Sequence, residues 1–193
     1  MTATTAPPRL FLALTAVVTA MAFLTAPAVQ AAAEIGKPIS FTAQTLSGQT
    51  INTANLKGRM VVVEFWATWC PPCVKLTPKL KAMHDKYAPE GVILLGVSLD
   101  RSESKVTQYT KKNHMTWPQI LNKRQPVDLG RAMFGGSYGI PRAVIIGPEG
   151  KVRWIGNAFG IESQLGALLT QHPMKLDEST RNQLVQEQLL RVG

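Results

Sequence analysis

The chain has only two cysteines among its 193 residues, and they stand three positions apart in EFWATWCPPC, the stretch from Glu64 to Cys73. A disulfide that closes so short a loop removes little entropy from the unfolded chain, so it would stabilise a fold only weakly. Two thiols at this spacing can instead form and break a disulfide without movement of the backbone. The pair therefore predicts thiol-disulfide exchange rather than a structural crosslink.

The residues around the pair place it between a buried strand and a helix. Residues 60–66 (MVVVEFW) are nearly all apolar, as in a strand buried on both faces, and apolar residues at helical spacing follow the cysteines. Cys70 is then expected at the helix N-cap, where unpaired N–H groups and the helix dipole favour a thiolate. We predict that Cys70 attacks the substrate disulfide and that Cys73, one turn further and deeper, resolves the mixed disulfide.

Two prolines and one acid are expected to tune this pair. Pro71 and Pro72 have no N–H group, so Cys70 keeps fewer backbone donors than other residues there would give it. We expect the thiol pKa of Cys70 to be lowered only moderately, which suits a reductant better than a strong oxidant. Glu64 stands in the predicted buried strand, and burial raises the pKa of a carboxyl enough for proton transfer near neutral pH. It is predicted to take the proton of Cys73; the alternative is a carboxylate that reaches solvent at the strand end.

The first 33 residues differ in character from the rest. Arg9 is the only charged residue before Glu34, and residues 10–24 (LFLALTAVVTAMAFL) form an apolar segment that small residues follow at cleavage spacing. This pattern predicts a secretory signal peptide over residues 1–33. The alternative is an uncleaved anchor that tethers the protein to the membrane, since the uncharged stretch is long enough to span a bilayer. In both cases we expect export, either into the periplasm or facing it.

The composition leaves room for one domain over residues 34–171 and a polar extension over residues 172–193, helical from Glu178 to Leu190. The content of 45% hydrophobic and 17% charged residues excludes a disordered chain and a multi-span membrane protein. The net charge of +9 comes from scattered lysines and arginines, which favours a generic basic surface over nucleic-acid binding.

Periodicity along the domain predicts an α/β fold, with a mixed central sheet covered by helices on both faces. The expected elements are a β-hairpin over 38–56, strands over 60–66, 91–99, 142–146 and 151–155, a helix from the cysteines to about residue 88 kinked at Pro78, and helices over 102–112, 127–134 and 161–169.

Two separate motifs resemble the thioredoxin family. One is FWATWCPPC, with Pro78 five residues later, and the other is GSYGIPRAVIIGPEGKV, which is similar to the family's Gly-Ile-Pro, strand, turn, strand segment. Over residues 34–171 the chain is most similar to the exported redoxin branch, which includes TlpA-like and cytochrome c maturation proteins. The resemblance implies a thioredoxin fold with an added N-terminal β-hairpin. We expect no cofactor and no metal beyond the redox-active Cys70–Cys73 disulfide.

The resemblance also implies roles for the second motif. Pro141 matches the family's cis-proline, which faces the cysteines, and the backbone of Ile140 would pair with an extended substrate strand. Arg142 stands where threonine is usual and adds a cation near the substrate. The predicted substrate-binding residues are Trp69, Pro71, Pro72, Ile140, Pro141 and Arg142.

Three positions show where the chain agrees with related families and where it differs from them. Glu64 occupies the place of the family's buried acid, but Gly96 appears where thioredoxins carry a lysine beside it. Peroxiredoxins share the hairpin region, yet their reactive cysteine follows a Thr or Ser by three positions, where this chain has Ala67 before Cys70. This difference argues against a peroxidase.

We therefore predict an exported, monomeric thiol-disulfide oxidoreductase that reduces disulfide-bearing proteins and is recharged by an upstream electron donor. The resemblance names apocytochrome c as one target. The alternatives are a disulfide oxidase or isomerase with the same site, and a copper-handling protein that binds Cu(I) through the two thiolates. A zinc site would need two more ligands, and no histidine stands at ligand spacing; His84 is expected on the surface of its helix.

Overall fold

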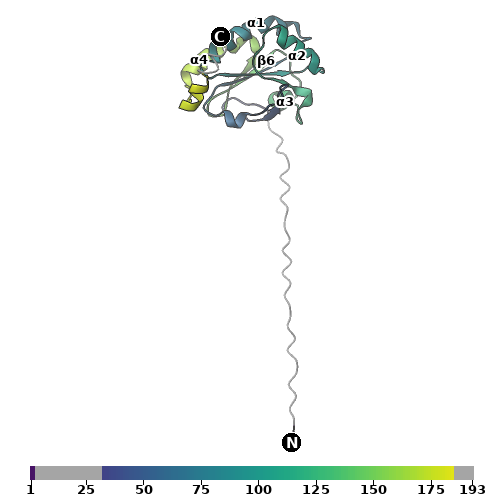
Figure 1. Cartoon of the computed structure of the whole chain (residues 1–193), viewed down its shortest axis with the longest axis vertical. Coiled ribbons are helices and arrows are strands. Elements are labelled where there is room, and N and C mark those ends of the chain that lie inside the picture. The colour runs from purple at the N-terminus through teal and green to yellow at the C-terminus, as the bar shows by residue number, and fades with distance from the viewer. Residues whose placement is uncertain (3–31, 185–193) are drawn as a thin grey trace.

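The computed structural model describes residues 1–2 and 32–184 (Figure 1). The predicted leader over residues 1–33 lies almost entirely outside the described residues, and so does the part of the predicted tail helix after residue 184. No helix among the described residues is both long and apolar enough to cross a membrane.

A mixed five-stranded sheet forms the centre of the fold. Its strands are β3 (Val61–Trp66), β4 (Ile93–Ser98), β5 (Gln119–Leu121), β6 (Arg142–Ile146) and β7 (Val152–Asn157), in the order β5-β4-β3-β6-β7. β4 is parallel to β3 and to β5, whereas β6 is antiparallel to β3 and to β7. All six residues of β3 are buried, because this strand lies in the middle of a sheet that is covered on both faces.

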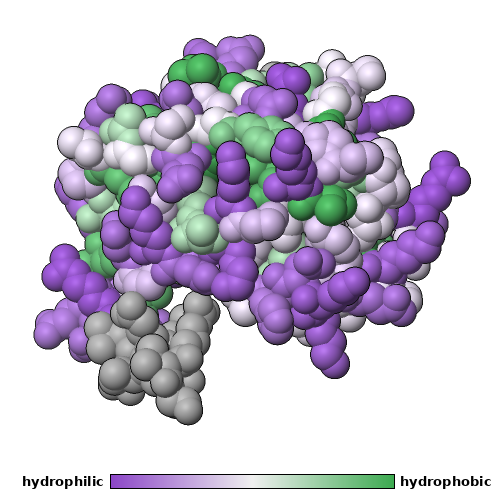
Figure 2. Space-filling view, turned by 90° about the horizontal axis from the view of Figure 1, so that it is seen from above, coloured by the Kyte–Doolittle hydropathy of each residue, from purple (hydrophilic) through white to green (hydrophobic). Residues whose placement is uncertain are grey.

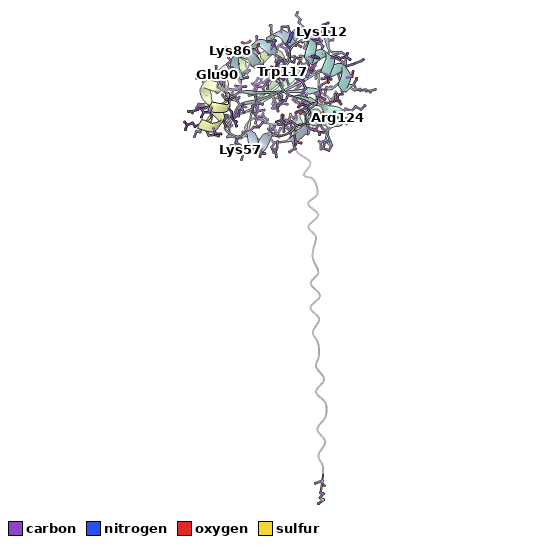
Figure 3. All side chains as sticks on the ribbon, in the orientation of Figure 1. Lys57, Lys86, Glu90, Lys112, Trp117 and Arg124 are labelled. Carbon is purple, nitrogen blue, oxygen red and sulfur yellow. A yellow bond between two sulfur atoms is a disulfide. The ribbon has the colours of Figure 1, made fainter. Side chains whose placement is uncertain are left out.

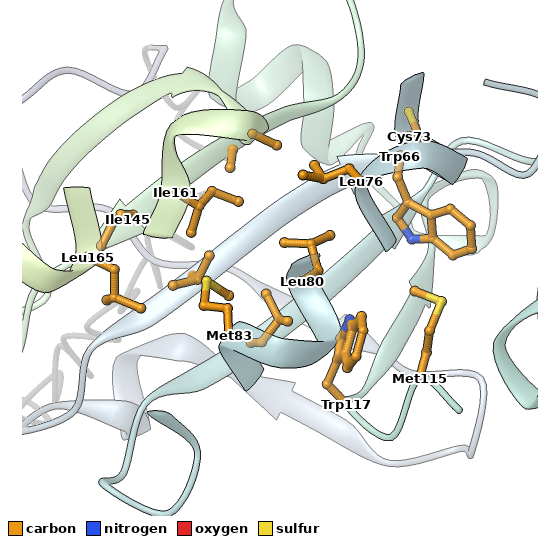
Figure 4. Close-up of a cluster of buried hydrophobic side chains, with 14 of the residues drawn as sticks. Trp66, Cys73, Leu76, Leu80, Met83, Met115, Trp117, Ile145, Ile161 and Leu165 are labelled. Carbon is orange, nitrogen blue, oxygen red and sulfur yellow. The ribbon is translucent and has the colours of Figure 1, made fainter. Parts of the chain in front are cut away.

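Helices cover both faces of the sheet, as the sequence predicts (Figure 1). They are α1 (Pro71–Tyr87), α2 (Glu103–Lys112), α3 (Leu129–Phe134) and α4 (Ile161–Gln171). On one face, Leu76 and Leu80 of α1 belong to the same hydrophobic core as Ile161 and Leu165 of α4 (Figure 4). On the other face, Met133 of α3 belongs to a second core. Each of these side chains stabilises the fold by about 1.5–3 kcal/mol through burial alone.

The predicted N-terminal hairpin is confirmed as a separate two-stranded antiparallel sheet of β1 (Thr42–Gln44) and β2 (Thr50–Asn52). It joins the main sheet at β5, where Thr45 bridges to Ile120 and the N–H of Leu46 donates to the carbonyl of Gln119. The sequence pattern does not predict β5 itself, because three residues are too few to show a period. It also misses three short 3-10 helices, η1 (Thr53–Leu56), η2 (Asn122–Arg124) and η3 (Ala158–Gly160).

His84 is buried, so the prediction that it lies on the helix surface is wrong. Only 7% of the residue is exposed, and its ring centroid lies 5.2 Å from that of Trp117, which points into the interior (Figures 3 and 4). His84 follows Leu80 by four residues, and residues at this spacing share a helix face. It therefore falls on the buried stripe of α1, while Lys86 projects from the surface (Figure 3).

Beyond α4 the chain returns to the end of the sheet where β3 and β4 begin. The N–H of Lys175 donates to the carbonyl of Gly58 at 3.1 Å, and Leu176 lies against Gly91. Residues 178–184 are helical, in agreement with the start of the predicted tail helix. Leu184 lines a pocket of about 380 Å³ together with Trp117 and other residues.

Candidate active site

The two cysteines form a disulfide at the beginning of α1. Cys70 is the N-cap residue of the helix, and its Sγ accepts a hydrogen bond from the backbone N–H of Cys73 at 3.3 Å. Their Cα atoms are 5.3 Å apart, and 4% of Cys70 and 2% of Cys73 are exposed. Cys70 therefore lies where a helix end can stabilise a thiolate, and Cys73 lies inside the core beside Trp66 (Figure 4).

Pro71 and Pro72 occupy the first two positions of α1 and are exposed. Proline suits the first turn of a helix, because an N–H group there has no partner within the helix. Trp69 precedes the disulfide and is 63% exposed. These three exposed residues are thus immediate chain neighbours of the two cysteines.

The side chain of Asp100 fixes the loop that carries β3 into α1, and the sequence reasoning missed it. Its Oδ2 accepts hydrogen bonds from the backbone N–H of Thr68 and the hydroxyl of Ser98, both at 2.8 Å. Its Oδ1 accepts from the hydroxyl of Thr68 at 2.6 Å. Asp100 is 2% exposed, and it links the end of β4 to the residues just before Cys70. The signal in the sequence is an acid directly after a buried strand.

The second motif lies against the disulfide. The peptide bond between Ile140 and Pro141 is cis, and the carbonyl oxygen of Ile140 lies 3.7 Å from Sγ of Cys70. The carbonyl of Pro141 accepts from the N–H of Ala158 at 3.3 Å, which connects this segment to η3. The structure therefore brings Cys70, Ile140 and Pro141 together from segments seventy residues apart.

The guanidinium of Arg142 is not brought to the disulfide. Arg142 pairs with Phe65 across β3 and β6, and residues that face each other across a ladder share one face of the sheet. Phe65 belongs to the core on the α3 side, and Cζ of Arg142 lies 4.7 Å from the ring centroid of Phe134. Strand alternation thus turns this side chain to the face opposite α1.

Glu64 is buried in the middle of the sheet, on the face that α1 covers. It alternates with Val63 and Phe65, which face α3, so its side chain points to the same side as Val62 and Trp66. It is 1% exposed, and within the described part of the chain neither carboxyl oxygen has a hydrogen-bond partner. Burial raises the pKa of Glu64 well above its usual value of 4.5.

The neighbours of Glu64 across the sheet are small, and a glutamine lies beyond one of them. Gly96 of β4 pairs with Glu64 on one side and with Gln119 of β5 on the other. A Cβ atom on Gly96 would lie 2.3 Å from Oε1 of Gln119, so this amide fills the space above the glycine. The same Oε1 accepts from Nε1 of Trp66 at 3.1 Å. The position that holds a lysine in thioredoxins is therefore covered here by a neutral amide.

Among residues 32–184 no cluster of three or more His, Cys, Asp or Glu side chains could hold a metal ion. The site combines the disulfide with the buried carboxyl of Glu64 and the amide of Gln119 beside Trp66. This set supports electron and proton exchange between sulfur atoms.

Comparisons with known proteins agree with this chemistry. The model of the AhpC/TSA family matches residues 35–155. The thiol-disulfide oxidoreductase ResA of Bacillus thuringiensis (strain Al Hakam) is 30% identical over 123 residues, which cover 62% of this chain and 67% of that protein. The sporulation thiol-disulfide oxidoreductase A of Bacillus subtilis is 33% identical over 90 residues, covering 45% of this chain and 54% of its own length.

A solved structure confirms the predicted fold. The thiol:disulfide interchange protein of Chlorobium tepidum, a thioredoxin-family protein, has a TM-score of 0.60 and 27% identity, and the match covers 72% of this chain and 99% of that one. The resemblance to thioredoxins noted from the two motifs is therefore confirmed. The chain belongs to the AhpC/TSA family, has a thioredoxin-like fold and is a thiol-disulfide oxidoreductase.

Proposed function

We propose that this protein is an exported reductant of protein disulfides that works through the Cys70–Cys73 pair. The observation that carries the proposal is the position of this disulfide, at the start of α1 and 3.7 Å from the Ile140 carbonyl that precedes a cis-proline. A substrate strand that pairs with the backbone of Ile140 would bring its own disulfide to Cys70.

The first step is the attack of Cys70 on the substrate. In the reduced protein the Cys70 thiolate attacks one sulfur of the substrate disulfide, a Cys70–substrate disulfide forms, and the substrate S–S bond breaks. The other substrate sulfur leaves as a thiolate and takes a proton from water. The N–H of Cys73 and the N-terminal end of α1 stabilise the attacking thiolate.

The second step releases the product. The carboxylate of Glu64 takes the proton of Cys73, and the resulting thiolate attacks Sγ of Cys70 and displaces the second substrate sulfur. That sulfur leaves as a thiolate and is protonated in turn, while Glu64 returns its proton to water. The substrate gains two electrons and two protons in total, and Cys70 and Cys73 lose them as their disulfide forms. An upstream dithiol donor then reduces this disulfide by the same exchange.

The two prolines support the proposed direction of electron flow, from this protein to its substrate. With Pro71 and Pro72 in the first turn, fewer N–H groups reach Cys70, so the reduced pair is stabilised less than in a strong oxidant. A reduction potential measured against glutathione tests this direction. A value near roughly −120 mV, as in strong oxidants, would identify an oxidase instead.

The setting proposed for this reaction rests on the leader pattern and on the resemblance stated above. It is an exported monomer with a domain over residues 34–171 and a polar extension over 172–193. The protein faces the periplasm or lies within it, with a membrane tether if residues 1–33 remain attached. Cytochrome c precursors with oxidised haem-binding cysteines are the proposed protein substrates.

Trapping with Cys73→Ala tests the proposal most directly. Without Cys73 the mixed disulfide on Cys70 cannot be resolved, so we expect stable adducts with protein substrates in the native compartment, found by non-reducing electrophoresis and mass spectrometry. Cys70→Ala is the matched control and should trap none. Equal amounts of adduct in the two variants would contradict the proposed mechanism. So would the absence of adducts from both.

A further inference from the structure

Three exposed apolar side chains belong to the segments that carry the disulfide or adjoin Pro141. Trp69 is 63% exposed, Phe159 43% and Val74 37%. Trp69 directly precedes Cys70, and Val74 lies in the first turn of α1. Phe159 lies in η3, whose first N–H donates to the carbonyl of Pro141. Exposed apolar groups that gather around one point mark an interaction surface.

Two lysines on the exposed side of α1 border these apolar residues. Nζ of Lys79 lies 6.0 Å from the ring centroid of Phe159, and Lys75 stands one turn earlier on the same helix face. Within residues 32–184 neither lysine forms an ion pair, whereas Lys81 of the same helix is paired with Asp85 at 2.6 Å. Figure 2 views the molecule from the α1 side and shows apolar residues between hydrophilic ones. The surface thus offers a positive charge beside exposed aromatic rings.

We propose that Trp69, Val74, Phe159, Lys75 and Lys79 form a docking surface that selects substrates with an acidic residue near the attacked cysteine. This inference rests on the proposed function and adds the class of substrate. Lys79 follows Cys70 by nine residues, which is about 14 Å along the helix axis. An extended peptide advances about 3.3 Å per residue, so the carboxylate that meets Lys79 stands about four residues from the substrate cysteine.

A peptide series measures this selectivity. Each peptide is alanine-rich, carries one cysteine as a mixed disulfide with thionitrobenzoate, and has one aspartate at a successive position on either side of the cysteine. The reduced wild-type protein attacks the peptide sulfur and releases coloured thionitrobenzoate, which gives the second-order rate constant. We expect the highest rate with aspartate about four residues away, exceeding the lysine-containing counterpart by up to about fivefold at low salt. The preference should shrink at high salt, because exposed charges are screened.

Variants identify which side chains cause the preference for aspartate-containing peptides. Lys79→Glu should reverse the preference toward lysine-containing peptides, and Phe159→Ala should slow the reaction with all peptides without changing their ratio. Lys86→Glu is the matched control, because Lys86 lies on the same helix with its Nζ 4.5 Å from the ring centroid of Tyr87 but near the other end of α1. This variant should keep the wild-type preference.

The outcomes separate this inference from the proposed function. If aspartate and lysine peptides react at equal rates while the release of thionitrobenzoate still depends on Cys70, the docking surface does not select acidic substrates and the inference is wrong. If no peptide reacts through Cys70, both the inference and the proposed function fail.

Discussion

At the scale of single residues, Glu64 carries a carboxyl that the fold buries without a hydrogen-bond partner in the described part of the chain. Its neighbours on the adjacent strands are Gly96 and Ala143, which have no polar side chain to offer. A buried acid with a raised pKa is suited to accept and return a proton near neutral pH. This is why we propose Glu64 as the proton acceptor for the buried Cys73.

Glu64→Gln tests this role, because the amide has the same size and cannot take up the proton. We expect resolution of the mixed disulfide to slow by about 100-fold near neutral pH, which is a typical contribution of a general base. The measurement is single-turnover release of a peptide from Cys70 across a range of pH. The wild-type rate should rise with ionisation of Glu64, and the variant should lack this rise. Glu90→Gln, on the exposed surface, is the control; overlapping profiles for wild type and Glu64→Gln would remove the proposed role.

The same residue predicts how stability depends on pH. Burial raises the pKa of Glu64 above 4.5, so the folded protein holds this proton more tightly than the unfolded chain does. Below pH 4.5 the Glu64 carboxyl is protonated in both the folded and the unfolded protein. Between pH 4.5 and the raised pKa, the free energy of unfolding falls by about 1.4 kcal/mol for each unit by which the pH rises. Glu64→Gln cannot ionise, so its stability relative to wild type should increase from about pH 5 to about pH 8. Urea unfolding at both pH values measures this, and parallel changes in the two proteins would contradict it.

At the scale of elements, α3 packs closely against the loop over residues 135–139, where Tyr138 covers Gly130. A Cβ atom on Gly130 would lie 1.6 Å from the hydroxyl oxygen of Tyr138. The ring of Tyr138 lies 5.0 Å from that of Phe134 and 6.1 Å from that of Phe65, measured between centroids. The loop leads into Ile140, whose carbonyl oxygen lies 3.7 Å from Sγ of Cys70.

Gly130→Ala should therefore push Tyr138 out and destabilise the fold by about 1–3 kcal/mol, the usual cost of an overfilled site. In a Tyr138→Ala background the same change should cost little, because the added methyl then has room. Gly166→Ala is the matched helical control: its Cβ would meet only the hydroxyl of Tyr87 at 3.6 Å, and we expect a gain of about 0.5–1 kcal/mol. Urea unfolding of these variants gives the change in the free energy of unfolding for each one. Additive changes for Gly130→Ala and Tyr138→Ala would disprove the proposed contact between the two residues.

The elements show which parts of the fold and site the sequence can predict. β3 and α1 carry long local patterns, so their bounds and the N-cap position of Cys70 follow from the residues alone. Asp100 and Gln119 reach the site only because β4 and β5 pair in a particular register, which no local pattern encodes. Arg142 is different, because alternation within its own strand already turns it away from the cysteines.

At the scale of the whole molecule, the redox site and the tail lie at opposite ends of the central strands. The disulfide follows the end of β3, whereas Lys175 and Leu176 contact Gly58 and Gly91, which precede β3 and β4. Leu184 also lines the pocket of about 380 Å³ near Trp117. Lys175, Leu176 and Leu184 are therefore placed to stabilise the end of the sheet far from the disulfide.

Ending the chain after His172 should thus separate stability from catalysis. The truncation removes the half-buried Leu176 and Leu184 and the hydrogen bond of Lys175. We expect the free energy of unfolding to fall by about 1–3 kcal/mol. The melting temperature should fall by about 2–4 °C for each kcal/mol lost. Calorimetry measures the change, and Leu176→Ala in the full chain should reproduce part of it. The rate of thionitrobenzoate release should stay at the wild-type value below the melting temperature, because Lys175 and Leu176 contact Gly58 and Gly91, before β3 and β4. A truncated protein that melts normally but reacts slowly would instead place the tail in the reaction, and would show that the two ends of the sheet are coupled.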